Sequence, residues 1–249
     1  MFNSSIGGGD AQRITIRGYD LVNDLVDKHD FIDLVYLAAL GEFPNENQRR
    51  MITLFMMTAM DHGLTPSALA TRLTLHGAPE SMQGAVAAGL LGAGSRYLGV
   101  SEYAARFLQS RLKEFKAGSA NCTNLDAFAD AVVAEERKAG RRMPGFGHPI
   151  HAETDPRSAK ILELATECGY VGEHCRFAEA LSGAAGRTAG KPVPLNAAGV
   201  KAAIMLDMGM NPEFGKGLTL IARVGGLVAH ILEERQQPIS QAVWEAARA

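Results

Sequence analysis

The chain has 249 residues, of which 47% are hydrophobic and 21% are charged, and its formal net charge at pH 7 is −2. This composition is typical of a globular protein, and the near-neutral charge gives no reason to expect nucleic acid or an anionic membrane as a partner. The three cysteines, Cys122, Cys168 and Cys175, form no CxxC pair. Neither a disulfide framework nor a metal site follows from them, and we expect a reducing, cytoplasmic location. The N-terminal segment lacks a secretion signal, and no apolar run reaches the roughly 20 residues of a membrane span.

Helix signals follow one another along the chain. Thr65-Pro66 and Asp155-Pro156 each combine an N-cap residue with a proline at the first helical position, and glycines mark many helix ends. Alternation typical of a strand is nearly absent apart from "RITIRG". We predict helices over residues 19–40, 46–60, 65–77, 85–95, 101–118, 123–140, 155–169, 172–186, 197–209, 213–235 and 239–248.

These signals predict an all-α protein. The helices over about 101–186 are more polar than those on either side. We therefore expect residues 10–100 and 195–249 to form a large helical domain, with residues 101–194 as a smaller helical domain.

Two histidines differ from the rest in their position. His62 and His148 each lie beside a glycine in a loop that precedes a capped helix. Helix N-termini attract anions, so a histidine there can donate to a carboxylate or transfer a proton. The alternative is that each histidine only satisfies a tight turn. Four histidines stand near helix ends or inside an apolar helix, where a structural role is the simpler interpretation: His29, His76, His174 and His230. We expect His151 to be a loop neighbour of the site and no more.

Three arginines predict a binding site for an anion. Arg157 opens a helix, where a cation opposes the helix dipole unless a ligand anion compensates it. Arg223 stands in an apolar helix and needs a partner, for which a carboxylate fits its planar fork. With Arg72, these residues predict a pocket for a di- or tricarboxylate. The alternative is internal salt bridges to acids such as Asp61 and Asp155.

Five segments of the chain, in the same order, resemble the citrate synthase superfamily, which includes the citryl-CoA lyases and the lyase module of ATP-citrate lyase. The segments are "IRGYDLVNDLVDKHDFIDLVYLAALGEFPNENQ", "DHGLTPSALATR", "GFGHPIHAETDPR", "LNAAG" and "LTLIARVGGLVAHILEE". The resemblance implies an all-α fold with a cleft between a large and a small helical domain. It also implies a homodimer or larger homo-oligomer, a small di- or tricarboxylate as substrate, coenzyme A as the acyl carrier, and no metal.

The family's functional positions can be carried over residue by residue. The resemblance implies a catalytic set, a substrate-binding set and a loop that grips coenzyme A. The catalytic set is His62, His148 and Tyr97. In the substrate-binding set, Arg157 and Arg223 match the arginines that hold citrate carboxylates, and we add Arg72 and Asn196 as further expected substrate-binding residues. The loop is formed by Gly145, Phe146 and Gly147.

Some positions depart from the family pattern. The acid that moves a proton at the acetyl group falls on Ala198, which cannot do so. Pro149 and Ala152 replace basic residues near coenzyme A, and Tyr97 stands where synthases have a histidine. The favoured function is a citryl-CoA lyase-like or citrate synthase-like enzyme that cleaves or forms a bond between an oxaloacetate-type acid and acetyl-CoA.

Two alternatives follow from the same departures. The first is a lyase or decarboxylase acting on a citrate-like polycarboxylate that carries no coenzyme A. The second is a non-catalytic protein that binds a citrate-like acid. Catalysis is favoured over sensing because a sensor would not need His62 at the reacting centre.

Overall fold

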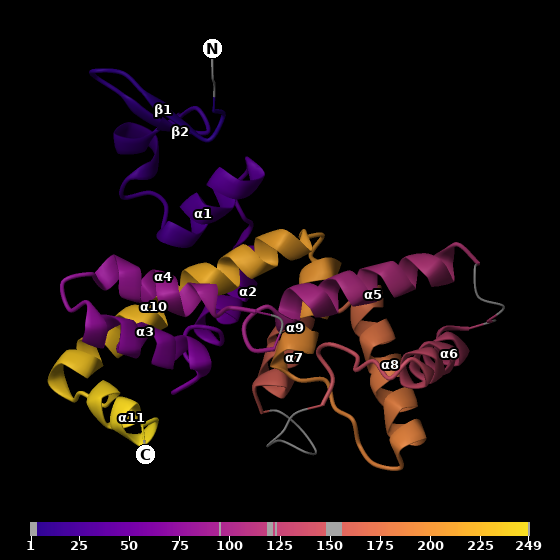
Figure 1. The fold of residues 1–249 in the computed structure, drawn as a ribbon. Coiled ribbons are helices and arrows are strands. Elements are labelled where there is room, and N and C mark those ends of the chain that lie inside the picture. The colour runs from indigo at the N-terminus through magenta and orange to yellow at the C-terminus, as the bar shows by residue number, and fades with distance from the viewer. Residues whose placement is uncertain (1–3, 95, 119–121, 123, 148–155, 249) are drawn as a thin grey trace. The chain divides into compact units, whose positions relative to one another are not determined.

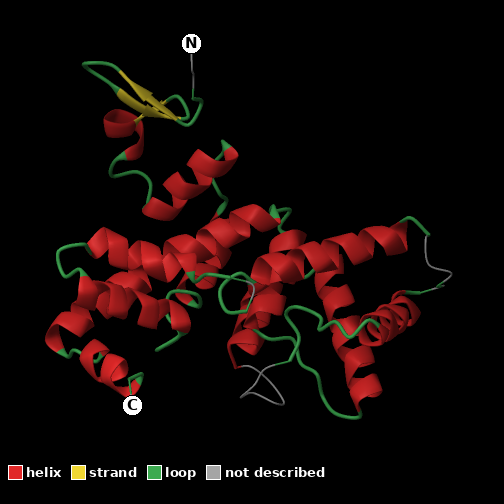
Figure 2. Cartoon of the chain, viewed as in Figure 1, coloured by secondary structure: helices red, strands yellow, loops and turns green. Residues whose placement is uncertain are grey.

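The structure is a computed structural model, and it describes residues 4–94, 96–118, 122, 124–147 and 156–248. The chain forms two compact units, Met1–Leu54 and Phe55–Ala249. Helices make up most of the described chain, and the only described sheet lies near the N-terminus (Figure 1 and Figure 2). The prediction of an all-α protein is therefore confirmed.

The first unit begins with a small antiparallel sheet in the order β1-β2-β3. Its strands are β1 (Gly7–Gly9), β2 (Ile14–Ile16) and β3 (Tyr19–Asp20). A single turn of π-helix, η1 (Leu21–Leu25), and helix α1 (Phe31–Leu40) follow, and α2 (Glu46–Met57) leads into the second unit. The strand expected in "RITIRG" is present as β2.

The predicted continuous helix over residues 19–40 is wrong. Asp20 caps η1 by accepting from the N–H groups of Val22 and Asn23, and Asp27 adopts a left-handed backbone at φ 67°. Asp30 then starts α1 with a capping box that pairs it with Asp33. Aspartates favour caps and turns over helix interiors because their short side chains bond to nearby backbone groups. The apolar periodicity was therefore interrupted by local capping.

The second unit is built of helices. In chain order after α2 they are α3 (Pro66–Gly77), α4 (Met82–Leu91), α5 (Val100–Lys116), α6 (Leu125–Lys138), α7 (Pro156–Glu167), α8 (Glu173–Ala189), α9 (Ala197–Asp207), α10 (Pro212–Gln236) and α11 (Ser240–Ala246). Thr65 caps α3 as predicted, accepting from the N–H of Ala68. The cap of α6 is Asn124, and residue 123, where the predicted helix begins, lies outside the described residues.

Two helices organise the core of this unit. Helix α9 is buried along most of its length and packs on α5, α7, α8 and α10. Helix α10 packs on α3, α4, α5 and α9 and buries Leu218, Ala222, Leu227 and Ile231. Each fully buried leucine or isoleucine contributes roughly 1.5–3 kcal/mol. Contacts of α9 with α5, α7 and α8 cross the expected domain boundary at residue 195, and the division into a large and a small domain stays a prediction.

By length and composition alone, α10 is the one helix in the described part of the chain that could cross a membrane. It nevertheless buries the charged side chains of Arg223 and Glu234. A long apolar helix that forms the centre of a folded unit has the same composition.

The N-terminus of α8 is capped by a residue from another helix. Asp207, at the end of α9, accepts from the N–H groups of Gly172 (2.7 Å), His174 (3.0 Å) and Cys175 (3.0 Å), and its carboxylate also lies 2.8 Å from His174 Nδ1. Burial raises the pKa of Asp207, but these hydrogen bonds outweigh it and hold the pKa at about 2. The ionised carboxylate thus joins α9 to α8.

This contact predicts how stability depends on pH. The pKa of Asp207 is about 2 in the folded state against 3.8 ordinarily, so its contribution is present above about pH 4 and disappears as the pH falls to 2. Asp207→Asn should lower the free energy of unfolding by about 2 kcal/mol at pH 7 and by far less at pH 2. Chemical denaturation across this range measures the difference. Asp130→Asn, which breaks an exposed pair with Arg187, is the control; an equal loss at all pH values for Asp207→Asn would contradict the assignment.

Candidate functional site

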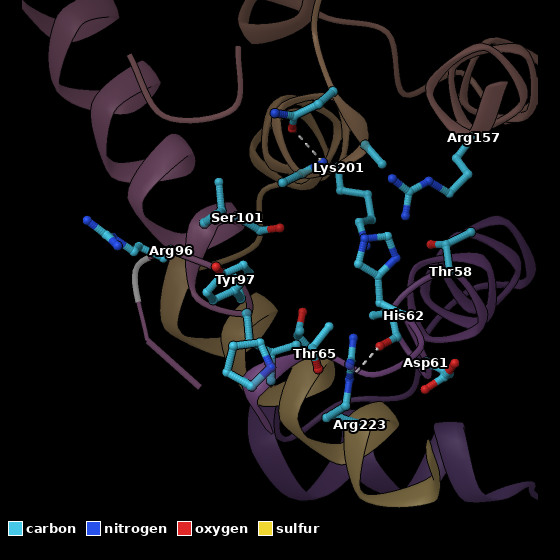
Figure 3. A pocket seen from close by; sticks show the side chains of 18 of the residues that line it. Thr58, Asp61, His62, Thr65, Arg96, Tyr97, Ser101, Arg157, Lys201 and Arg223 are labelled. Atoms are coloured by element: carbon cyan, nitrogen blue, oxygen red, sulfur yellow. Dashed lines mark hydrogen bonds between the residues drawn. The ribbon is translucent and has the colours of Figure 1, made fainter. Parts of the chain in front are cut away.

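A pocket of about 510 Å³ lies within the second unit. Its walls come from the turn before α3, the segment before α5, the start of α9, the middle of α10 and the first turn of α7. The side chains of His62, Arg157 and Lys201 converge on it, and Arg223 reaches it from α10 (Figure 3).

His62 is held in a tight turn between α2 and α3. The Asp61 carboxylate accepts from the N–H of Gly63 at 2.8 Å, and Gly63 takes a left-handed backbone at φ 69°, which glycine adopts without strain. The Gly63 carbonyl then accepts from the N–H of Thr65 at 2.8 Å. The turn thereby leads directly into the capped start of α3 and leaves the exposed His62 side chain at the pocket.

Helix α10 packs against this turn and contacts it at three positions. Arg223 is 5% exposed, and its Nε donates to the carbonyl oxygen of Ala59 at 3.1 Å. Three residues further along, a Cβ at Gly226 would lie 2.1 Å from the carbonyl oxygen of Met60. One helical turn later, His230 Nε2 lies 2.9 Å from Asp61 Oδ1. The spacing of three and four residues places these three positions on one face of the helix.

Burial and neighbouring charges shift the pKa values of Arg223 and Asp61. Burial lowers the pKa of Arg223, while the charge of Asp61 opposes that shift. Burial raises the pKa of Asp61, but hydrogen bonds from Gly63, His230 and the His62 backbone outweigh it and leave the pKa below its usual value. Asp61 is therefore a carboxylate at neutral pH and does not serve as a proton donor.

Asn196 ties the start of α9 to the glycine loop. Its Nδ2 donates to the carbonyl of Gly147 at 2.8 Å, and its backbone N–H donates to the carbonyl of Gly145 at 3.1 Å. Gly145 has φ 90°, and a Cβ on it would lie 2.7 Å from the Cα of Gly199. Only glycines permit this approach of loop to helix. Phe146 pairs with Leu195 as an isolated β-bridge.

The four remaining positions of the predicted site divide as follows. Tyr97, which is 59% exposed, and Arg157 both line the pocket, as does Ala198 on α9. His148 follows Gly147 directly but lies outside the described residues, as do Pro149 and Ala152. Arg72 is not a lining residue of the pocket.

Residues 39–243 of the chain match the family described as "Citrate synthase, C-terminal domain". The chain belongs to the citrate synthase family. Its structure is similar to that of a citryl-CoA lyase from Hydrogenobacter thermophilus, with a TM-score of 0.82 and 35% identity over 95% of this chain and 88% of that one.

Two further relatives are longer proteins. An ATP citrate lyase from Methanothrix soehngenii, solved in complex with citrate and coenzyme A, shares the fold with a TM-score of 0.76, at 22% identity over 94% of this chain and 39% of that one. A citrate synthase from Haloferax volcanii is 27% identical over 224 residues, which is 88% of this chain and 55% of the synthase. The chain therefore spans about half the length of that synthase.

For Arg72, the structure distinguishes between ligand binding and internal salt bridges. Its side chain is 2% exposed, with Nη1 donating to Glu234 at 2.9 Å and Nη2 bonded to Glu233 and to His230. It is thus held by internal ion pairs, with different acids from those expected. His230 is a core histidine with partners on both nitrogens, as predicted.

The sequence analysis missed several polar side chains that line the pocket. Lys201 is the lone cation of the apolar helix α9, and this isolation was a signal that could have found it. The others stand in ordinary polar contexts and gave no such signal: Thr58, Arg96, Ser101 and Thr219.

The described lining of the pocket is strongly basic. Its cations outnumber its acids by four to one, since Asp61 is the single carboxylate there. The cations are Arg96, Arg157, Lys201 and Arg223. Such a site attracts a ligand with several negative charges. No group of three metal-ligating side chains occurs among the described residues.

Two adjacent glycines test how α10 supports the turn. Gly226→Ala would drive its Cβ into the Met60 carbonyl at 2.1 Å, whereas the nearest atom to a Cβ at Gly225 is Met60 Cγ at 3.8 Å. We expect Gly226→Ala to lower the free energy of unfolding by about 1–3 kcal/mol. Gly225→Ala should be neutral or raise it by up to about 1 kcal/mol, because alanine favours the helix. Urea denaturation compares them, and equal effects would contradict the close contact.

Proposed function

We propose that this member of the citrate synthase family is a citryl-CoA lyase-like or citrate synthase-like enzyme. It would cleave or form the carbon–carbon bond between an oxaloacetate-type acid and acetyl-CoA. The observation that carries the proposal is the convergence of His62, Arg157 and Arg223 on one basic pocket. The 35% identity to a citryl-CoA lyase over 88% of its length supports the same activity.

The geometry suggests how cleavage would run. Arg157 and Arg223 would hold carboxylates of the substrate, because a guanidinium fork matches a carboxylate. His62 would take the proton of the tertiary hydroxyl as that carbon becomes a carbonyl. The electron pair of the broken bond passes to the methylene carbon next to the thioester carbonyl. The acetyl-CoA enolate formed there would take its proton from water or from an acid other than residue 198. His148 is proposed as the donor to the oxygen at the reacting carbon.

Coenzyme A would meet the loop of residues 145–147. The Gly147 N–H already donates to the carbonyl of Pro194 at 2.8 Å, and the carbonyls of Gly145 and Gly147 accept from Asn196. Those peptide groups hold the loop in place, and of its three residues Gly147 lines the pocket, so coenzyme A would approach the loop there. Coenzyme A would supply the thioester, whose carbonyl stabilises a negative charge on the adjacent carbon as an enolate. We also propose a cytoplasmic homodimer or larger homo-oligomer.

A second candidate activity is a lyase or decarboxylase for a citrate-like polycarboxylate without coenzyme A. The observation that favours it is Ala198, which lines the pocket and offers no group that can move a proton, one turn before the cation of Lys201. A protein that binds the acid without catalysis is the third outcome that the tests below distinguish.

Calorimetry with citrate, oxaloacetate and acetyl-CoA separates these candidates. We expect the protein to bind both the acid and the thioester, and to cleave citryl-CoA. No binding of acetyl-CoA at millimolar concentration would overturn the first candidate, and citrate consumption without coenzyme A would favour the second. Binding of citrate with no turnover of either substrate would point to a non-catalytic protein.

The site assignment has its own test. Arg157→Gln should weaken citrate binding by about 10- to 100-fold, as expected for a lost charge-assisted hydrogen bond. His62→Ala should lower turnover by about 100- to 10,000-fold. Arg187→Gln, which changes an exposed arginine paired with Asp130, should alter neither. Unchanged citrate affinity in Arg157→Gln would contradict its role in the pocket.

The missing acid can be restored. Ala198→Asp places a carboxyl group on the pocket wall of α9, and we expect it to raise the rate of citryl-CoA cleavage by supplying the proton that turns the enolate carbon into the acetyl methyl group. Ala198→Asn has the same shape without an acidic proton and is the matched control. An equal rate in both variants would mean that the proton comes from elsewhere.

A further inference from the structure

The buried guanidinium of Arg72 makes a set of contacts that leads to the pocket. Its Nη1 donates to Glu234 Oε2 at 2.9 Å, and the Glu234 side chain is only 5% exposed. Its Nη2 contacts Glu233 as well, and both Nε and Nη2 point at His230 Nδ1, at 3.2 Å and 2.9 Å. A buried cation that has two acids close by does not need an imidazole for charge balance. The contact with His230 therefore calls for an explanation beyond ion pairing.

The contact decides which nitrogen of His230 carries the hydrogen. Arginine only donates hydrogen bonds, so Nδ1 of His230 must accept with its lone pair. The hydrogen of the neutral ring then sits on Nε2, which lies 2.9 Å from Asp61 Oδ1 and donates to it. Arg72 thereby selects the tautomer that can hold Asp61. Helix α4, which also packs on α10, carries no titratable side chain that could compete.

The Asp61 carboxylate links His230 to the turn that carries His62. One carboxylate oxygen accepts from His230, and the other accepts from the N–H of Gly63 at 2.8 Å. His62 lies between these two anchored residues, and its side chain lines the pocket. Contacts therefore run from Arg72 on α3 through His230 on α10 to Asp61, which flanks His62. Neither Arg72 nor His230 lines the pocket.

We propose that Arg72 and His230 are positioning residues, which act through Asp61 to aim His62 at the substrate. The inference rests on the proposed function, in which His62 handles the hydroxyl proton. Arg72 is thereby moved from the predicted substrate-binding set to a role behind the site. Because Arg157 and Arg223, rather than His62, would hold the substrate carboxylates, disturbing the positioning pair should affect the chemical step more than substrate affinity.

Two substitutions of His230 test this directly. Glutamine can donate to Asp61 and accept from Arg72 at once, whereas leucine can do neither. We expect His230→Leu to lower kcat for citryl-CoA cleavage by about 10- to 100-fold with little change in KM, because a small misplacement of a catalytic group is costly. His230→Gln should stay within about threefold of the unchanged protein. An equal loss of kcat in both variants, or no loss in His230→Leu, would overturn the proposal.

A matched control separates positioning from stability. Arg111 is a partly buried arginine, with a side chain 14% exposed, that is paired with several glutamates, Glu114, Glu135 and Glu136, and it is not a lining residue of the pocket. Arg111→Met should lower the denaturation midpoint without lowering kcat. If Arg111→Met lowers kcat as much as His230→Leu does, the effect is general destabilisation and the proposal fails.

Nitrogen NMR of the histidine side chains gives a readout that does not depend on turnover. We expect the His230 ring to be protonated on Nε2 and unprotonated on Nδ1 in the unchanged protein, and Arg72→Met to shift this balance. A hydrogen on Nδ1 in the unchanged protein would overturn the inference. If the protein cleaves no citryl-CoA, the proposed function fails, whereas the tautomer measurement still decides whether Arg72 sets His230.

Discussion

The carbonyl oxygen of Met60 occupies the space that a side chain at residue 226 would fill. Helix α10 and the turn that carries His62 can meet this closely because residue 226 is glycine. The polar contacts on either side, from Arg223 to Ala59 and from His230 to Asp61, depend on that approach. One face of α10 thereby positions the backbone of the turn, holds the Asp61 carboxylate and supplies Arg223 as one cation of the pocket.

A second close approach between backbones, also made possible by glycines, forms the wall at the start of α9. The start of α9 approaches the loop of residues 145–147 because both Gly145 and Gly199 lack side chains, and Asn196 then bonds the two segments. The loop is held by the protein's own peptide groups and by the Asn196 side chain. Between these walls the cations gather, which is unfavourable for an empty site and favourable for a polyanion. A basic pocket of this kind fits the polycarboxylate proposed as the substrate.

Polar groups in this fold are satisfied across helices as well as within them. Asp207 of α9 caps α8, where the residue at the cap position, Gly172, has no side chain to do so. Arg72 of α3 is neutralised by the acids of α10. These contacts join sequence positions 32 to 162 residues apart. Arg72 was predicted to bind substrate because no local sequence pattern identifies partners as distant as the acids of α10.

The sequence by itself determined the elements whose signals are local. Thr65-Pro66 started α3, and the glycine beside His62 marked a turn, because caps and left-handed turns involve residues a few positions apart. The same reasoning failed over residues 19–40, where aspartates bonded to their own backbone and interrupted the apolar period. Only the tertiary structure decided that Lys201 lines the pocket and that Arg72 lies behind it. Both outcomes depend on which helix faces come together, and that is set by packing of the whole unit.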